Sequence, residues 1–318
     1  MSKKPIIGIT MGDPNGIGPE IIVQALSNAE IQGLCDSVVF GDSEIIQAAA
    51  DKTGSSTNFK VENCSGFGKK DLNPGTVDKK AGLASLDYIS AAVNSALARD
   101  IDAMVTAPIS KESTHLAGSR YPGHTEMLQD LTGADEAVMM FEGSKFKVML
   151  VTIHTALSNV PSMITKDRVA STIKITHDSL INLFKLSEPK IVVCGLNPHV
   201  GEAGAFGYEE INHIIPAVEE AREAGINIEG PLPADTLFYY ANQGKWDAVV
   251  AMYHDQGLIP FKMVSFNEGV NITLGLPIIR TSPDHGTAYD IAWRGKADPS
   301  SMIAAIKVAA LLAINKSA

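Results

Sequence analysis

The stretch Pro5-Ile-Ile-Gly-Ile-Thr-Met-Gly-Asp-Pro-Asn-Gly-Ile-Gly-Pro-Glu20 has the pattern of a buried strand, a glycine-rich turn and the start of a helix. Residues 5–10 are mostly apolar and β-branched, as in a strand inside a parallel sheet. The glycines allow a tight turn and close approach to a ligand, and Pro19 suits the first turn of a helix. They do not match the Gly-x-Gly-x-x-Gly fingerprint, which disfavours a Rossmann site. The turn is either an ordinary strand-to-helix connection or a ligand loop.

Short apolar runs alternate with longer helical patterns along the rest of the chain. This alternation predicts an α/β fold with a mostly parallel sheet and helices on both faces. The expected strands cover residues 5–10, 37–40, 103–106, 147–153, 190–194 and 247–252. The expected helices cover residues 19–27, 43–51, 80–98, 166–185, 209–223, 235–241 and 300–314. Residues 53–78 are polar and turn-rich, so we expect an irregular, exposed segment there.

Composition limits the kinds of partner that this chain can have. Its 318 residues suffice for one large domain or two of ordinary size, and 45% of them are hydrophobic, enough for a full core. The net charge of −10 argues against nucleic acid or an anionic membrane surface as the main partner. We expect neither a signal peptide nor a membrane span. Cys35, Cys64 and Cys194 form no CxxC pair and are interpreted as reduced thiols of a cytoplasmic protein.

Three histidines occur in one repeated setting, each just after an apolar run that is expected to be a buried strand. They are His154, His199 and His254. Ligands bind outside the carboxyl ends of the strands in open α/β sheets, so three imidazoles at that edge could converge on one metal ion. A lone histidine in this position is more often structural. The threefold repetition favours a metal site.

Two further groups of residues have the composition of an anion site. Lys111, His124 and Thr125 lie in loops near the end of the strand expected at 103–106 and offer a cation and two hydrogen-bond donors. Lys262, Asn271 and Arg280 fall within one short window of otherwise apolar sequence. A lysine, an arginine and an amide that converge would bind a phosphate. Ion pairs with some of the many acidic residues are the alternative.

Two loops have more than one interpretation from the residues alone. Asp235 follows a proline-rich segment and is either the N-cap of the helix expected at 235–241 or a carboxylate that orients a metal-bound histidine. His285-Gly-Thr-Ala288 is a loop of small residues where the phosphates or adenosine of a cofactor could lie against the backbone.

Several long motifs in order resemble the 4-hydroxythreonine-4-phosphate dehydrogenase family, and the resemblance covers nearly the whole chain. The motifs are Met-Gly-Asp-Pro-Asn-Gly-Ile-Gly-Pro-Glu (11–20), Gly-His-Thr-Glu (123–126), Gly-Leu-Asn-Pro-His (195–199), Gly-Pro-Leu-Pro-Ala-Asp-Thr (230–236), Tyr-His-Asp-Gln-Gly (253–257) and Asn-Ile-Thr-Leu-Gly-Leu-Pro (271–277). Residues 16–20 and 285–288 also look like loops of isocitrate and isopropylmalate dehydrogenases, which bind NAD(P) without a Rossmann fingerprint.

The resemblance implies a two-lobed α/β/α fold and a homodimer with the active site in a cleft near the subunit interface. The first lobe would comprise residues 1–118 and 276–318 and carry the cofactor loops. The second, residues 119–275, would carry the metal and form the dimer. The implied metal ligands are His154, His199 and His254. The implied substrate contacts are His124, Thr125, Lys262, Asn271 and Arg280.

The implied activity is oxidation of 4-phosphooxy-L-threonine at C3 with decarboxylation to 3-amino-2-oxopropyl phosphate, in pyridoxal phosphate biosynthesis. Close paralogues that oxidise 4-phospho-D-threonate or 4-phospho-D-erythronate are the first alternative. A phosphotransacetylase-like acyltransferase and a non-catalytic phosphometabolite sensor are alternatives of other classes. The implied cofactors are NAD or NADP and one divalent metal per subunit, with zinc expected first and cobalt, manganese or magnesium also able to act.

The general base and the cofactor contacts are the two remaining roles to be assigned. Asp235 and Lys111 are the candidates for the general base. The cofactor contacts are expected in two loops, at Gly12, Asp13, His285, Gly286, Thr287 and Ala288. No arginine or lysine stands immediately beside Tyr289, which favours NAD, because the additional phosphate of NADP requires a cation.

Overall fold

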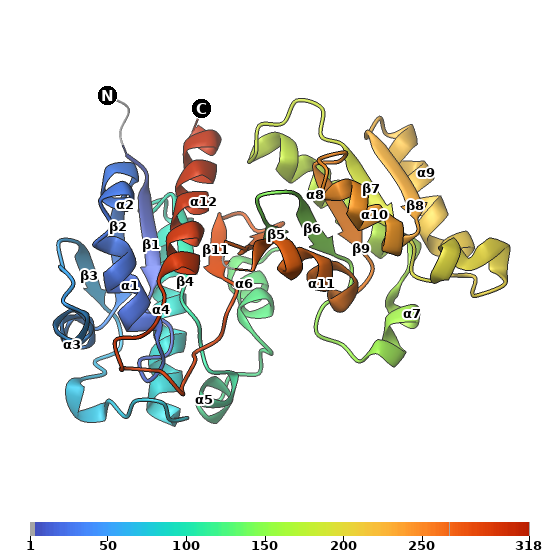
Figure 1. Cartoon of the computed structure of the whole chain (residues 1–318). Helices are drawn as coiled ribbons and strands as arrows, with labels where there is room; N and C mark the ends of the chain where they lie inside the picture. The colour runs from blue at the N-terminus through green and yellow to red at the C-terminus, as the bar shows by residue number, and fades with distance from the viewer. Residues whose placement is uncertain (1–3, 267, 318) are drawn as a thin grey trace. The chain divides into compact units, whose positions relative to one another are not determined.

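The computed structural model describes residues 4–266 and 268–317, and they divide into two compact units (Figure 1). The first unit extends to Ala137 and resumes at Leu276, and the second is Val138–Gly275. The chain therefore leaves the first unit later than the expected boundary at residue 118. Residues 119–137 contain α6 (His124–Thr132), which packs against α4 (Lys79–Leu97) of the first unit. That packing keeps the segment in the first unit.

The first unit is built on a parallel sheet in the order β3-β2-β1-β4-β11. Its strands are β1 (Ile6–Thr10), β2 (Asp36–Gly41), β3 (Lys60–Asn63), β4 (Ala103–Thr106) and β11 (Arg280–Pro283). Its other helices are α1 (Gly18–Leu26), α2 (Ala29–Leu34), α3 (Ser43–Thr53), η1 (Lys69–Asp71), α5 (Lys111–Leu116) and α12 (Ser300–Ser317). The irregular segment expected at 53–78 thus includes the edge strand β3. Because β11 comes from the end of the chain, both terminal regions build this sheet.

The second unit has a mixed sheet in the order β10-β5-β6-β9-β7-β8. Its strands are β5 (Val138–Glu142), β6 (Lys147–Leu150), β7 (Ile191–Cys194), β8 (Ile228–Leu232), β9 (Ala248–Ala251) and β10 (Val270–Leu274). Its helices are η2 (Leu157–Asn159), α7 (Val160–Met163), α8 (Lys166–Asn182), η3 (Pro198–Gly204), η4 (Glu210–Ile214), α9 (Ile215–Glu223), α10 (Ala234–Ala241) and α11 (His254–Ser265). Pairs β10–β5 and β5–β6 are antiparallel and the others are parallel.

Local chemistry explains where the main helices begin and end. Asp78 caps α4 by accepting hydrogen bonds from the backbone N–H groups of Lys80 and Ala81. Thr165 caps α8 in the same way through the N–H of Arg168. Gly54 ends α3 in the left-handed conformation, with φ of 68°, which a glycine adopts without a steric penalty.

The core of each unit is made by apolar strands and the helices that cover them. In the second unit, Phe261 of α11 contacts Phe141 and Phe146, with ring centroids 5.7 and 6.3 Å apart. In the first unit, α12 packs on β4 and β11 (Figure 1). Its length and composition alone would allow it to span a membrane, but residues along its apolar face are buried in this packing, as in the core helix of a globular domain. The three cysteines are free thiols, as predicted.

Candidate functional site

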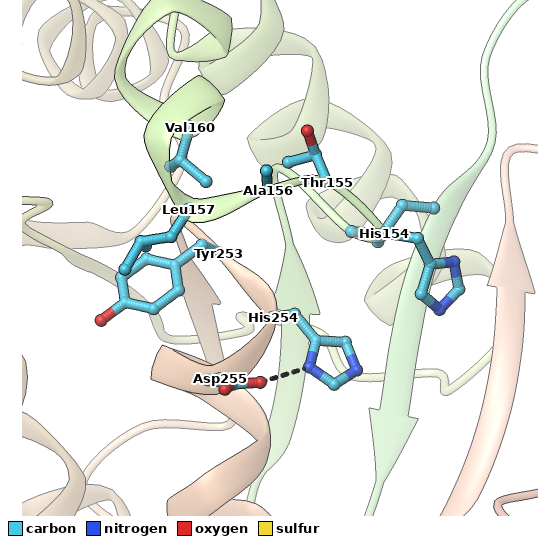
Figure 2. Close-up of a pocket in the computed structure, with 9 residues that line it drawn as sticks. His154, Thr155, Ala156, Leu157, Val160, Tyr253, His254 and Asp255 are labelled. Atoms are coloured by element: carbon cyan, nitrogen blue, oxygen red, sulfur yellow. Dashed lines mark hydrogen bonds and ion pairs between the residues drawn. The ribbon is translucent and has the colours of Figure 1, made fainter.

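Two of the three predicted metal ligands lie together at the carboxyl edge of the second unit's sheet. His154 follows β6 and His254 begins α11 directly after β9. Strands β6 and β9 are parallel neighbours, paired through Leu150 and Ala251 at their ends. The imidazole centroids of His154 and His254 are consequently 5.9 Å apart, and their planes are inclined by 41°. Figure 2 shows both rings beside the cavity at this edge.

The cavity beside the two histidines has a volume of about 420 Å³. Its remaining walls combine apolar and polar side chains from the loop after β6 and the start of α11, namely Ile153, Thr155, Ala156, Leu157, Val160, Tyr253 and Asp255 (Figure 2). A mainly apolar pocket with a few convergent polar groups is typical of a small-molecule site.

Asp255 fixes the orientation of the His254 ring. A carboxylate oxygen of Asp255 lies 2.7 Å from Nδ1 of His254. This contact favours the tautomer with the proton on Nδ1 and leaves Nε2 as the atom that can bind a metal. With Zn–N bonds of about 2.0–2.1 Å, two imidazoles sharing one ion have ring centres about 5–6 Å apart. The centroid separation of His154 and His254 lies within this range.

His199 lies in a loop of unusual backbone conformation. Five consecutive residues, from His199 to Ala203, have left-handed dihedral angles, although only Gly201 among them lacks a side chain. His199 is exposed, and its ring is 6.5 Å from that of Phe206. Among residues 4–266 and 268–317, no three His, Cys, Asp or Glu side chains are grouped closely enough to hold a metal. His199 is thus not gathered with the other two histidines.

A buried glutamate, which the sequence did not single out, organises the His199 loop. The Oε1 atom of Glu210 accepts the backbone N–H groups of Leu196 and Asn197 at 2.8 and 2.6 Å. Its Oε2 accepts the side-chain amide of Asn197 at 2.9 Å. Glu210 is fully buried. The Glu210 carboxylate thus satisfies buried donors of the segment that leads into the left-handed turn.

Gln256 connects the two histidine-bearing segments. Its side-chain oxygen accepts the N–H of Met252 at 2.7 Å, and its amide nitrogen donates to the carbonyl of Gly195 at 2.7 Å. The turn that carries His254 is thereby joined to the start of the loop that carries His199. The sequence signal was the polar triplet His-Asp-Gln at 254–256, in which only the histidine had been assigned a role.

The first unit holds a separate cluster of buried polar groups around Arg280. Arg280 is only 3% exposed. Its Nε and Nη2 atoms donate hydrogen bonds to Oγ1 of Thr106 at 3.1 and 2.7 Å. Burial lowers the pKa of Arg280 to about 9. A buried cation is costly unless an anion accompanies it. The negative charge of Glu126 opposes the lowering of this pKa, so a carboxylate already lies in the surroundings of the guanidinium.

His124 contributes a further unsatisfied polar atom to the first unit. Its Nε2 is buried and has no hydrogen-bond partner within the described residues. Burial, and secondarily the positive charges of Arg280 and Lys111, hold the pKa of His124 well below its ordinary value. The ring is therefore neutral at pH 7. His124 begins α6, whose N-cap Gly123 offers no side-chain oxygen, and Thr125 is buried in the same first turn. Helix amino termini of this kind attract anions.

The remaining predicted contacts are distributed between the units. Lys111 is exposed at the start of α5. Lys262 lies on α11, and Asn271 on β10 has a buried Oδ1 without a partner among the described residues.

Asp235 is exposed in the first turn of α10, where it accepts the N–H of Thr236 at 2.9 Å. Pro233 is the N-cap of that helix, so the N-cap interpretation of Asp235 was wrong. The helix begins one residue earlier than expected.

The two loops assigned to the cofactor are joined to each other in the first unit. The N–H of Ile17 donates to the carbonyl of Thr287, and the hydroxyl of Tyr289 donates to Asp13 at 2.7 Å. Gly12 and Asp13 are buried beneath this junction. His285 and Gly286 are exposed, and Thr287 and Ala288 are partly so. The exposed surface available to a cofactor therefore comes from the loop at residues 285–288.

The family assignment follows from comparison with known proteins. The profile described as "Pyridoxal phosphate biosynthetic protein PdxA" matches residues 33–309. The chain belongs to the PdxA family. A PdxA relative, the 4-hydroxythreonine-4-phosphate dehydrogenase of Desulforapulum autotrophicum, is 49% identical over 98% of this chain and 96% of its own length.

The chain is also similar to a dehydrogenase with a different named substrate and to a solved structure. The D-threonate 4-phosphate dehydrogenase of Cupriavidus necator is 45% identical over 98% of both chains. The crystal structure of 4-hydroxythreonine-4-phosphate dehydrogenase from Klebsiella pneumoniae has a TM-score of 0.88 at 39% identity, covering 98% of this chain and 100% of that one. These PdxA-family relatives confirm the predicted α/β fold and the assignment of the chain to a family of dehydrogenases.

Proposed function

We propose that this chain oxidises 4-phosphooxy-L-threonine at C3 and releases its carboxyl group as CO2, giving 3-amino-2-oxopropyl phosphate for pyridoxal phosphate biosynthesis. Relatives named 4-hydroxythreonine-4-phosphate dehydrogenase at 46–49% identity support this substrate. The observation that carries the proposal is the pair of imidazoles, His154 and His254, with the carboxylate of Asp255 behind the second ring. Such a pair suits a metal-assisted reaction at a hydroxyl group.

In this proposal His154 and His254 hold a divalent metal, with His199 as the third ligand. When bound, the ion supplies Lewis-acid polarisation of the C3 oxygen, an effect worth several kcal/mol. Zinc is the first choice for imidazole ligands, and cobalt, manganese or magnesium are the alternatives. Asp255 keeps the His254 ring oriented with Nε2 outward. Lys111 and Asp235 are the candidates for accepting the proton of the C3 hydroxyl.

The phosphate group of the substrate is proposed to bind the cationic and polar groups described above. These are His124, Thr125, Lys262, Asn271 and Arg280. The burial of the Arg280 guanidinium and of Nε2 of His124 supports this role, because a phosphate oxygen accepts charge-assisted hydrogen bonds from an arginine. Binding through the remote phosphate also orients C3 for reaction.

NAD is proposed as the hydride acceptor, with the loop at His285, Gly286, Thr287 and Ala288 as its main contact. Gly12 and Asp13 would support that loop from beneath. The exposed backbone at Gly286 is what supports the assignment, since a cofactor can approach it closely. NADP is the alternative cofactor.

A homodimer located in the cytoplasm is proposed for the intact enzyme, with the second unit at the interface. Support comes from α11, where Ile259, Met263 and the adjacent Phe266 are 59%, 81% and 75% exposed. Their spacing of four and three residues places them on one side of the helix. An apolar stripe so exposed is typical of a surface that a partner covers.

A D-threonate 4-phosphate dehydrogenase is the second candidate, because the relatives with that name are 42–46% identical to this chain. The two substrates differ at C2, which bears an amino group in one and a hydroxyl group in the other. A phosphotransacetylase-like acyltransferase or a phosphometabolite sensor would have no use for an NAD-linked oxidation.

The test is NADH formation from each phosphorylated C4 acid, with and without a chelator. We expect turnover of 4-phosphooxy-L-threonine at a higher kcat/KM than 4-phospho-D-threonate, with loss on metal removal and recovery when Zn²⁺ is restored. A reversed preference would select the second candidate. Binding without turnover of either acid would select the sensor. Full metal occupancy in His199→Ala would remove His199 from the ligand set.

A further inference from the structure

Two N–H groups of the Arg280 guanidinium donate to the side chain of Thr106. Thr106 ends β4 and is 1% exposed, and Arg280 begins β11. The strands are parallel neighbours, with Arg280 opposite Met104. This pairing brings together residues that are 174 positions apart in the sequence.

The geometry of the contact restricts how the guanidinium can turn. Nε and Nη2 both point to the single oxygen Oγ1 of Thr106, at 3.1 and 2.7 Å. Since a guanidinium is planar and has five N–H donors in a fixed arrangement, engaging two of them on one edge sets the plane and leaves three for other partners. A threonine adds no charge. It orients the cation without neutralising it, whereas a carboxylate in the same place would compete with an incoming anion.

We propose that Thr106 is a positioning residue that orients Arg280 to receive the phosphate group of the substrate. The inference rests on the proposed function, since it takes Arg280 to be a phosphate contact. In this proposal Thr106 acts through Arg280 and does not itself contact the substrate. If Thr106 lost its hydroxyl group, Arg280 would keep its charge and its place on β11. It would lose the two hydrogen bonds to Thr106 that orient its donors.

The experiment compares Thr106→Val with Thr106→Ser in the full-length enzyme. Valine has nearly the shape of threonine but cannot accept the two hydrogen bonds, whereas serine can. Steady-state kinetics with the phosphorylated acid and calorimetric titration with inorganic phosphate are the readouts. We expect Thr106→Val to raise KM and the Kd for phosphate roughly 10- to 100-fold, as loss of contacts to a charged group does. Thr106→Ser should stay within about threefold of the wild type in both, because it keeps the acceptor.

Thr281→Val provides the matched control. Thr281 is the next residue on β11, is fully buried, and donates its hydroxyl to the carbonyl of Ala305 at 2.9 Å. Loss of the Thr281 hydroxyl should lower Tm and leave the affinity for phosphate unchanged. If Thr106→Val also lowered Tm without changing KM or the Kd for phosphate, Thr106 would have a structural role only and the proposal would be wrong. Should the valine variant not fold, Thr106→Cys, a weaker acceptor, is expected to bind phosphate less tightly than Thr106→Ser.

The outcomes separate this inference from the proposed function. Absence of turnover with either acid would count against the proposed function, while the phosphate titrations would still decide the role of Thr106. Normal turnover with equal KM in the valine and serine variants would overturn the role of Thr106 alone. A wild-type protein that binds no inorganic phosphate would also overturn it.

Discussion

At the scale of single residues, Gly286 offers a clean test of the cofactor loop. A Cβ atom placed there would have none of the described atoms within 4 Å, so a larger side chain fits the described part of the protein. Gly286→Leu should therefore leave Tm unchanged but raise KM for NAD, because the side chain would occupy the space that the cofactor needs. Equilibrium NAD binding and metal content are the measurements. Unchanged NAD affinity would move the cofactor site away from this loop.

Gly12 provides the contrasting control for that experiment. Its φ of 73° lies in the left-handed region, and a Cβ atom would stand 2.4 Å from the carbonyl oxygen of Pro108. Gly12→Ala should consequently lower Tm, since the backbone of the loop must shift. Comparing the two variants distinguishes a glycine required by the fold from one required by a ligand.

Asp13 should make stability depend on pH in a recognisable direction. Burial raises the pKa of Asp13 above its ordinary value, although a hydrogen bond from Tyr289 opposes the shift. The folded protein thus holds this proton more tightly than the unfolded chain. The stability linked to it is fully present below the unfolded pKa, about 3.9, and is lost as the pH rises through the folded pKa.

Asp13→Asn removes this titration while keeping an acceptor for the N–H of Asn15. The free energy of unfolding of the variant should therefore improve relative to the wild type as the pH rises from about 4 through the folded pKa. Urea denaturation of both proteins at several pH values measures the difference. A constant difference across that range would contradict the assignment of the raised pKa to Asp13.

At the scale of elements, the His199 loop depends on Glu210. Glu210→Ala would leave the buried N–H groups of Leu196 and Asn197 without their acceptor, at a cost of about 2–4 kcal/mol in unfolding free energy. Glu209→Ala is the matched control, because Glu209 is only partly buried and accepts only one hydrogen bond from Asn197. Denaturation, together with amide hydrogen exchange at Leu196 and Asn197, would detect the effect. Equal losses in both variants would contradict it.

Elements with a strong hydrophobic period were predictable from the sequence, and those shaped by pairing partners were not. The buried parallel strands β1, β4, β7 and β9 were expected within two residues of their observed ends. Strands β5 and β10 were missed because their antiparallel pairing joins segments more than 100 residues apart. Helix α11 was missed because Pro260 interrupts its pattern, although the helix continues through it.

The same distinction applies to the site. His154 and His254 could be placed at one sheet edge because each follows a buried strand, and those strands are neighbours. The conformation at His199 could not be foreseen, since left-handed angles at residues with side chains are disfavoured, and nothing in the sequence marked Glu210 as the residue that binds the start of this loop. The link between Thr106 and Arg280 requires knowing that β4 lies beside β11.

At the scale of the whole molecule, the exposed stripe on α11 predicts how the subunits associate. Met263→Lys should shift the enzyme from dimer to monomer, because a charge would be buried at the interface proposed for the second unit. Leu116→Lys, at an exposed leucine of α5 in the first unit, should have no such effect. Sedimentation velocity over a range of concentrations measures both. A dimer of unchanged stability in Met263→Lys would exclude this face of α11.

The discontinuous first unit has a consequence for synthesis on the ribosome. Its sheet is completed by β11, and α12 covers β4 and β11, yet the whole second unit is encoded between them and the earlier strands. The second unit, a continuous segment, can fold while the first still waits for its last strand. Arg280 follows the whole second unit in the sequence. A nascent chain therefore acquires its buried cation site only after the second unit has been synthesised.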